Sequence, residues 1–168
     1  MNLEHLNELK KLLSSPKKIA IIPHKNPDGD AIGSTLALWH YLVNTGHTAS
    51  IVAPNTLDFN HLGRVGQMSE ILESAKATFV MVDHHQEPSD YAKIMYSDVK
   101  MSSTCEMVYV LINQLGDENS ITPEMANCIY TGIMTDTGSF KFAATTSNTH
   151  RVIADLMDKG AEGTEIHH

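Results

Sequence analysis

The chain has 168 residues, with 12 Lys or Arg against 20 Asp or Glu, so its formal charge is −8 when His is neutral. This balance excludes a nucleic-acid binder that works by bulk positive charge. Apolar residues make up 42% of the chain and charged residues 19%, which is typical of one globular domain and not of a disordered or fibrous chain.

The first half of the chain alternates between helical and extended patterns. Leucines recur at helical spacing over the first 14 residues, which predicts an amphipathic helix. The short run of apolar, β-branched residues from Lys18 to Pro23 predicts a strand buried on both faces of a parallel sheet. Residues 31–44 predict a helix that ends at Thr45-Gly46, and residues 49–53 predict a second strand.

The second half continues this alternation, with strands predicted at 77–82 and 94–97. Ser103 and Glu106 have the spacing of a capping box, which predicts a helix up to about Leu115. Thr122-Pro123-Glu124 has the features of another helix start, and a last helix follows Ser147. Strands and helices in this order predict an α/β fold with a mostly parallel sheet flanked by helices.

Residues 51–59 do not fit this alternation, because two strand-like pieces are separated by little more than Pro54 and Asn55. Parallel neighbours need a crossover of a dozen or more residues. Either the two pieces form one bent element, or a segment near residues 55–56 is missing from the chain; we favour the missing segment.

The first group of chemically active residues lies where the first strand gives way to its helix. His24, Asp28 and Asp30 fall within seven residues, with Pro27 and Gly29 shaping a tight turn between them. One imidazole and two carboxylates suit a hard or borderline divalent ion, and the carboxyl end of a strand is where ligands bind in open α/β sheets. In the alternative interpretation, the acids merely cap the following helix.

A second group, Asp83, His84 and His85, follows the apolar strand at 77–82. Three consecutive titratable groups at the end of a buried strand are poorly explained by packing, because each costs energy when it is desolvated without a partner. Because both groups follow predicted strands, we expect them at the same edge of the sheet.

Two further acids extend this set. Asp58 lies in an apolar context that resembles a strand end, and Arg64 follows it. Asp136 is predicted at the C-terminus of a helix, where negative charge is unfavourable by a few tenths of a kcal/mol to about 1 kcal/mol and a nearby cation would compensate it. Four carboxylates held together would repel one another unless protons or metal ions neutralised them, and two divalent ions supply both that neutralisation and phosphoryl chemistry.

Other reaction classes lose support because their motifs are absent from the sequence. The chain has no HExxH helix for a single zinc, no phosphate-binding GxxxxGK[ST] loop, no GxGxxG fingerprint and no GxSxG elbow. Cys105 and Cys128 lack metal-type spacing and are expected to be reduced core thiols of a cytoplasmic protein. The longest apolar run, Met107 to Ile112, is far shorter than the roughly 20 residues that span a bilayer, so we expect no membrane segment.

The acids and histidines lie in segments that resemble, in order, the four motifs of the DHH phosphoesterase family. These segments are His24 to Ser34, Asp58 with Arg64 beyond it, Asp83 to His85, and Gly132 to Phe140. Within that family the chain is most similar to the bacterial nano-RNases, adenosine-bisphosphate phosphatases and exopolyphosphatase-related proteins.

This resemblance implies a manganese-dependent phosphoesterase with two ions, for which Mg²⁺ or Co²⁺ are alternatives. One ion would be held by His24, Asp28 and Asp58, and the other by Asp30, Asp58, His84 and Asp136. His85 would face the scissile phosphate, Asp83 would orient the neighbouring imidazoles, and Arg64 would help to meet the charge on the phosphate oxygens.

Two departures from the family pattern define the expected domain organisation. Family members carry a longer stretch between the first and second motifs, which agrees with a missing segment near residues 55–56. They also continue into a smaller C-terminal domain that holds the substrate. We therefore expect residues 1–168 to form a single catalytic domain that lacks both parts.

The implied function is hydrolysis of phosphoester bonds in short single-stranded oligonucleotides or small nucleotide phosphates, by a cytoplasmic protein that can form a homodimer. Pyrophosphate or polyphosphate is the alternative substrate class. A non-catalytic module that only binds metal is a third, less favoured interpretation.

Overall fold

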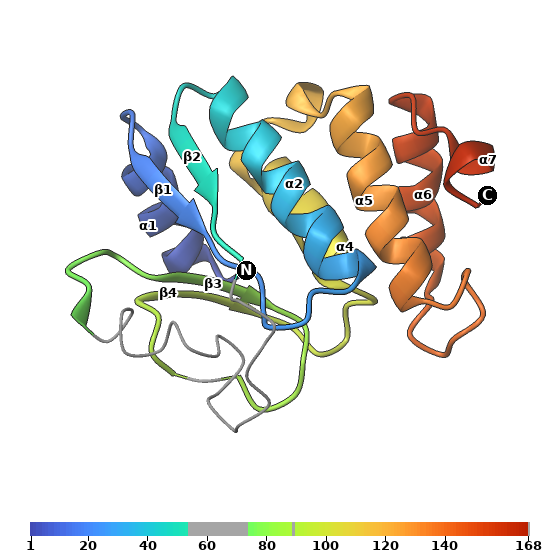
Figure 1. Cartoon of the computed structure of the whole chain (residues 1–168), viewed down its shortest axis with the longest axis horizontal. Helices are drawn as coiled ribbons and strands as arrows, with labels where there is room; N and C mark the ends of the chain where they lie inside the picture. Colours follow the sequence, from blue (N-terminus) through green and yellow to red (C-terminus); the bar gives the residue numbers. More distant parts are fainter. Residues whose placement is uncertain (54–73, 89, 168) are drawn as a thin grey trace.

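Helices and short parallel strands alternate along the chain in the computed structural model, which describes residues 1–53, 74–88 and 90–167 (Figure 1). Two of the predicted site residues, Asp58 and Arg64, and the predicted missing segment near residues 55–56 lie outside the described residues. None of the described helices combines the length and apolar character needed to cross a bilayer.

The first half of the chain forms two helices and two strands. Helix α1 (Leu3–Leu13) is followed by strand β1 (Lys18–Ile21), helix α2 (Gly29–Asn44) and strand β2 (Thr48–Ile51). Helix α2 begins two residues before its predicted start because Asp28 is its N-cap and accepts a hydrogen bond from the amide of Ala31 at 2.9 Å.

The second half contains the remaining elements. Strands β3 (Val80–Asp83) and β4 (Ile94–Ser97) precede helix α4 (Thr104–Leu115), the short 3₁₀ helix η2 (Glu118–Ser120) and helix α5 (Pro123–Asp136). Helices α6 (Ser147–Asp158) and α7 (Gly163–Ile166) follow, of which α7 was not predicted. Strand β3 begins later than expected and ends on Asp83 itself, so His84 and His85 are the first residues after it.

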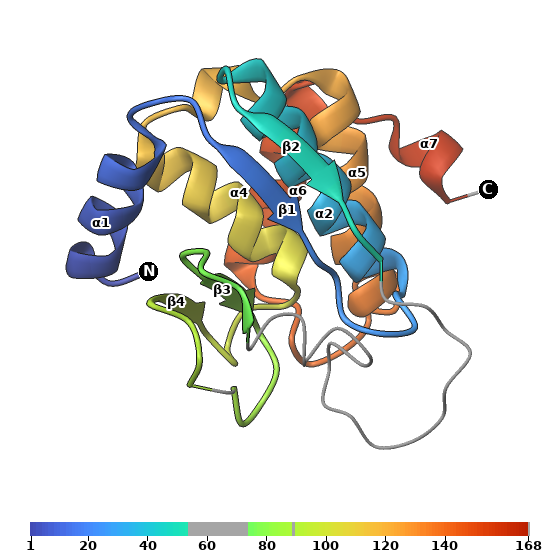
Figure 2. The ribbon, with the colours of Figure 1, turned by 60° about the vertical axis from the view of Figure 1, so that its left-hand side comes forward.

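The strands form two parallel pairs, which confirms the predicted α/β class. Strand β1 pairs with β2, with Ile21 opposite Ile51, and β3 pairs with β4, with Asp83 opposite Ser97. The prediction that the first strand is buried on both faces was wrong, since Ala20 is exposed and only Ile21 is buried. Figure 2 shows the reason: helices α2, α4, α5 and α6 lie behind β1 and β2, and no described element covers the near face of this pair.

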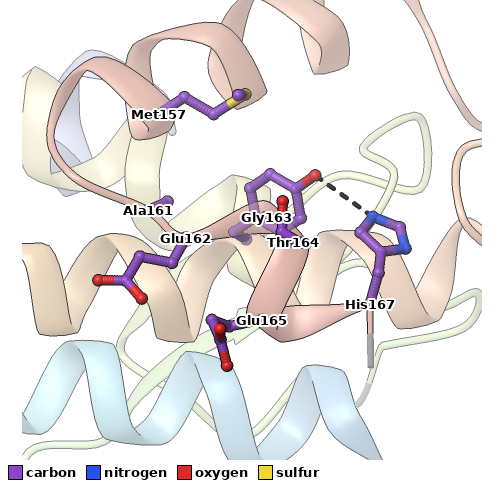
Figure 3. A pocket seen from close by; sticks show the side chains of 8 residues that line it. Met157, Ala161, Glu162, Gly163, Thr164, Glu165 and His167 are labelled. Carbon is purple, nitrogen blue, oxygen red and sulfur yellow. Dashed lines mark hydrogen bonds between the residues drawn. The ribbon is translucent and has the colours of Figure 1, made fainter.

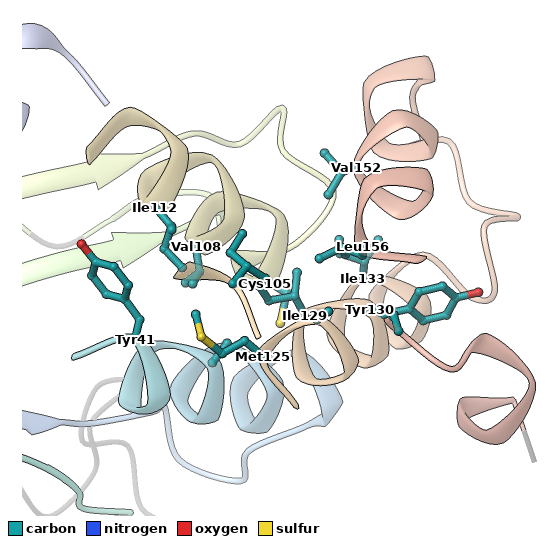
Figure 4. Packing of buried hydrophobic residues seen from close by; sticks show 14 of the residues in the cluster. Tyr41, Cys105, Val108, Ile112, Met125, Ile129, Tyr130, Ile133, Val152 and Leu156 are labelled. Atoms are coloured by element: carbon teal, nitrogen blue, oxygen red, sulfur yellow. The ribbon is translucent and has the colours of Figure 1, made fainter. Parts of the chain in front are cut away.

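The main hydrophobic core lies between helices α2, α4, α5 and α6 (Figure 4). Cys105, Ile112, Ile129, Ile133 and Leu156 are completely buried there. The Cys105 thiol is buried and free, as predicted, whereas Cys128 is only half-buried. A second cluster packs α1 and β4 against α4 through residues such as Leu9, Ile94 and Met107.

Helix α5 packs closely against α2 and α4 through glycine. A Cβ atom at Gly132 would clash with the Cys105 thiol and would lie 3.1 Å from the Cα of Asp30. Because Gly132 has no side chain, the C-terminal part of α5 lies against the first turns of α2 and α4. This packing brings the N-termini of two helices and the C-terminus of a third to one end of the bundle.

Candidate metal centre

Three ligand-type side chains from distant segments meet at this end of the bundle. Asp30 lies in the first turn of α2, His84 follows β3 directly, and Asp136 is the last residue of α5. One ligand atom from each lies within 4.8 Å of the others. Nε2 of His84 is 3.2 Å from Oδ2 of Asp136 and 3.8 Å from Oδ2 of Asp30.

The Asp30 carboxylate is fixed by the N-terminus of α4. Its two oxygens accept hydrogen bonds from the backbone amides of Thr104 and Cys105, both at 2.8 Å. The side chain is almost fully buried, and it also belongs to the first turn of α2. Two helix N-termini therefore favour negative charge at Asp30, and the two backbone amides hold its carboxylate in place.

Asp136 has the opposite environment. Burial, together with the nearby charges of Asp30 and Asp28, raises the pKa of Asp136 to about 6, although His85 and His24 act in the other direction. Its position at the C-terminus of α5 is also unfavourable for an anion, as the sequence indicated. A cation beside Asp136 would relieve this crowding of negative charge, and oxygen and imidazole donors suit a hard or borderline divalent ion.

His24 and Asp28 lie beside this group but are not part of it. Nδ1 of His24 donates to the carbonyl oxygen of Lys25 at 2.8 Å, so in the neutral ring Nε2 has a free lone pair, and it lies 3.8 Å from Oδ1 of Asp28. Asp28 also caps α2, as the alternative interpretation of the sequence proposed. The cap and a ligand role are compatible, because a carboxylate has a second oxygen and additional lone pairs.

His85 is oriented by Asp83. Its Nδ1 and its backbone amide both lie within hydrogen-bonding distance of Oδ1 of Asp83, at 2.7 and 3.1 Å. The ring centres of His84 and His85 are 4.4 Å apart, and those of His24 and His85 are 6.0 Å apart. The His85 ring therefore lies beside both His24 and His84. Because Nδ1 faces Asp83, Nε2 is the ring nitrogen that could donate a proton to a bound group or accept one from it.

The sequence did not reveal what holds Asp30. The Ser103 capping signal located the start of α4, but no residue-level pattern pairs a backbone amide at position 104 or 105 with a side chain more than 70 residues earlier. The predicted capping box was also only half right. Ser103 accepts from the amide of Glu106, whereas the Glu106 side chain bonds to Ser102, Asn148 and Thr149.

A separate cavity of about 610 Å³ lies between α5, α6 and α7 (Figure 3). Its lining includes Tyr130, Glu162, Glu165 and His167, and the Tyr130 hydroxyl lies 3.3 Å from Nε2 of His167. None of its lining residues belongs to the acidic and histidine group.

The chain belongs to the DHH family, because the model of the DHH family N-terminal domain matches residues 18–133. It is 33% identical over 181 residues to the bifunctional oligoribonuclease and PAP phosphatase NrnA of Thermus thermophilus, with 95% of this chain and 55% of the relative aligned. It is 27% identical over 172 residues to a probable manganese-dependent inorganic pyrophosphatase of Streptococcus agalactiae, with 84% of this chain and 55% of the relative covered.

The fold has a solved counterpart in an exopolyphosphatase-related protein from Bacteroides fragilis. The two superpose with a TM-score of 0.89 at 31% identity, over 98% of this chain and 59% of the other. The chain thus spans a little more than half the length of the proteins that it matches.

Proposed function

We propose that this chain is the catalytic domain of a metal-dependent phosphoesterase that hydrolyses short oligonucleotides or small nucleotide phosphates. The observation that carries this proposal is the convergence of Asp30, His84 and Asp136 from three distant segments, with ligand atoms within 4.8 Å of one another. The similarity to a bifunctional oligoribonuclease and PAP phosphatase supports the substrate class.

The donor set supports two divalent ions, with Mn²⁺ as the first candidate and Mg²⁺ or Co²⁺ as alternatives. Asp30, His84 and Asp136 would hold one ion, and His24 with Asp28 would hold the other, while Asp58 would bridge the two. Carboxylate oxygens and imidazole nitrogens are the donors that such ions accept. The raised pKa of Asp136 is further support, because it reflects crowded negative charge that a cation would neutralise.

Bound divalent ions would supply charge neutralisation on the phosphate and a lowered pKa for the attacking water. The chain's own residues would position the reactants. Asp83 holds Nδ1 of His85, so the opposite nitrogen of that ring would contact a phosphate oxygen and would give or accept the proton there. Arg64 would add a second donor to the phosphate.

Substrate recognition would draw on a part of the protein outside residues 1–168. We propose that residues 1–168 are one catalytic domain, and that a smaller C-terminal domain completes the substrate site. A cytoplasmic location and a homodimer, as expected from the resemblance, belong to the same proposal.

Inorganic pyrophosphate is the second candidate substrate, because the chain is also similar to a probable manganese-dependent pyrophosphatase. The two substrates differ in whether a base is present for recognition. An enzyme for pyrophosphate would need several cationic side chains around the phosphates, whereas one for dinucleotides would need an aromatic or apolar surface for a base.

The test is hydrolysis by the full-length protein, with Mn²⁺ added in steps. The substrates are a 5′-phosphorylated dinucleotide, adenosine 3′,5′-bisphosphate and pyrophosphate, with a nitrophenyl phosphodiester as a generic probe. We expect manganese-dependent cleavage of the dinucleotide and of adenosine 3′,5′-bisphosphate. An Asp136→Asn variant, which lacks one proposed metal ligand, serves as the inactive control. Faster cleavage of pyrophosphate would favour the second candidate, and tight Mn²⁺ binding without any cleavage would favour a non-catalytic module.

A further inference from the structure

The carboxylate of Glu106 is buried in the first turn of α4, and Glu106 is neither a proposed metal ligand nor a group that would contact the phosphate. Its side chain is only 2% exposed, as complete a burial as that of many core leucines. A buried carboxylate is costly unless several hydrogen bonds satisfy it, so its presence requires a specific partner set.

That partner set consists of neutral donors from the bend before α4 and from α6. One carboxylate oxygen accepts from the amide and hydroxyl of Ser102 and from the hydroxyl of Thr149, the last at 3.1 Å. The other oxygen accepts from the Asn148 side-chain amide at 3.1 Å. Glu106 therefore joins Ser102, the residue before the N-cap of α4, to the first turn of α6.

The turn that Glu106 secures is the one that holds Asp30. Thr104 and Cys105, which donate their backbone amides to Asp30, are the two residues immediately before Glu106. Ser103, the N-cap, is completely buried and accepts from the amide of Glu106. A displacement of this turn would move both amides away from the Asp30 carboxylate.

We propose that Glu106 is a positioning residue for the candidate metal centre, and this inference rests on the proposed function. By fixing the first turn of α4 against α6, Glu106 holds the two backbone amides that orient the Asp30 carboxylate toward His84 and Asp136. Its effect is expected at the ion held by Asp30, because the two amides that it positions donate to the Asp30 carboxylate.

The test measures Mn²⁺ affinity in a His24→Ala parent, in which only the ion held by Asp30 is expected to bind. Titrations are run at low temperature on protein shown by circular dichroism to be folded. In this parent, Glu106→Ala is expected to weaken Mn²⁺ binding about 10- to 100-fold, the range typical of removing a residue that orients a ligand. Ser102→Ala removes only the hydroxyl donor and is expected to weaken Mn²⁺ binding less. This variant replaces Glu106→Ala in the test if Glu106→Ala does not fold.

Two variants separate positioning from general stabilisation. Glu106→Gln is expected to retain nearly the parent affinity, because the Gln oxygen can accept from Ser102 and Thr149 while the Asn148 amide rotates to accept from the new NH₂ group. Tyr109→Phe removes another contact between α4 and α6, the 2.8 Å hydrogen bond from the Tyr109 hydroxyl to Asp155. It is expected to lower the melting temperature without changing the Mn²⁺ affinity.

The outcomes distinguish the two levels of the proposal. If the parent binds Mn²⁺ and Glu106→Ala binds it equally well, the positioning role is wrong and the metal centre stands. Equal losses in Glu106→Ala and Tyr109→Phe would also overturn the positioning role, since any weakened contact between α4 and α6 would then suffice. If the parent and the wild-type chain bind no Mn²⁺, the metal centre itself is wrong, and the inference fails with it.

Discussion

Asp30 and Asp136 carry the same functional group in opposite environments. The Asp30 carboxylate lies at the N-termini of α2 and α4 and accepts two backbone hydrogen bonds, so the helices stabilise its charge. Asp136 ends α5, where the helix dipole opposes a negative charge. In the absence of a cation, the negative charge of Asp30 is therefore stabilised by the protein, whereas the negative charge of Asp136 destabilises the folded state.

Asp136→Asn is expected to stabilise the metal-free protein by about 1–3 kcal/mol at pH 7.5, because the neutral amide avoids the cost of burying a charge and the repulsion with Asp30 and Asp28. The pKa of Asp136 is raised to about 6 in the folded state. The folded state therefore holds this proton more tightly than the unfolded chain, whose Asp pKa is near 4. The gain should vanish below about pH 4, where both states are protonated, and be complete above pH 6.

Urea denaturation in the presence of a chelator, from pH 4 to pH 8, measures this gain. Saturating Mn²⁺ should reverse the order, because the charged wild-type carboxylate is a much stronger ligand for the ion than the neutral amide of Asn. The explanation by charge crowding would be wrong if Asp136→Asn were less stable than the wild type throughout this range without metal.

At the scale of the elements, the junction of α2, α4 and α5 determines the shape of the site. Gly132 is the point of closest approach, since an added Cβ would lie 2.9 Å from the Cβ of Cys105 and would clash with its thiol. Asp30 is on the other side of the same contact. Any added volume at Gly132 therefore displaces α4, α2 or both.

Gly132→Ala is expected to cost about 1–3 kcal/mol in the free energy of unfolding, which is typical of overpacking a filled core. It should also weaken Mn²⁺ binding, because it moves the backbone at Asp30. A double-mutant cycle with Cys105→Ala checks the cause: removal of the thiol should recover part of the loss, which urea denaturation would show as a coupling energy. Additive effects would mean that the contact with Cys105 is not the source of the cost.

The pattern of the sequence predicted most of these elements because periodicity and capping are local properties. The Thr122-Pro123 signal located the start of α5, and the β4 range was predicted without error. The burial of β1 was predicted wrongly, since it depends on which faces the helices cover, and this is decided by tertiary packing. The Glu106 side chain was also misplaced, because its partners Asn148 and Thr149 lie about 40 residues away in the sequence.

At the scale of the whole molecule, the candidate site joins two parts of the fold that also pack together through the second hydrophobic cluster. Asp30 belongs to the helical bundle, whereas His84 follows the β3–β4 pair, which is separate from β1–β2 among the described strands. Metal ligation would therefore fasten one part of the fold to the other. Binding that is confined to the folded state stabilises it by mass action.

Mn²⁺ at about 100 times its dissociation constant should stabilise the chain by about 2.7 kcal/mol, which corresponds to a rise in melting temperature of about 5–10 °C. Differential scanning calorimetry with Mn²⁺, and with chelator as the reference, measures this rise. His84→Ala should lose most of the shift, whereas His5→Ala, a histidine on α1 far from the group in sequence, should retain it. An equal shift in both variants would place the ion elsewhere.

The convergence of the site could be predicted only in outline. The rule that ligands gather at the carboxyl ends of parallel strands placed the groups around Asp30 and Asp83 at a common edge. The same rule gives no side-chain distances, and it does not apply to Asp136, which enters from a helix C-terminus. The position of Asp58, which lies outside the described residues, remains a prediction from the sequence.

The hydrogen bonds from Thr104 and Cys105 give Asp30 a structural use that needs no ion at all. If the proposed activity is correct, a descendant of this chain that had lost it would still need that aspartate to join α2 to α4. Asp136 accepts no comparable pair of backbone hydrogen bonds among the contacts described, and burial and nearby carboxylates oppose its charge in the absence of an ion. In a search for pseudoenzymes among such proteins, the residue at position 136 is therefore the informative one, and an intact aspartate at position 30 is not proof of turnover.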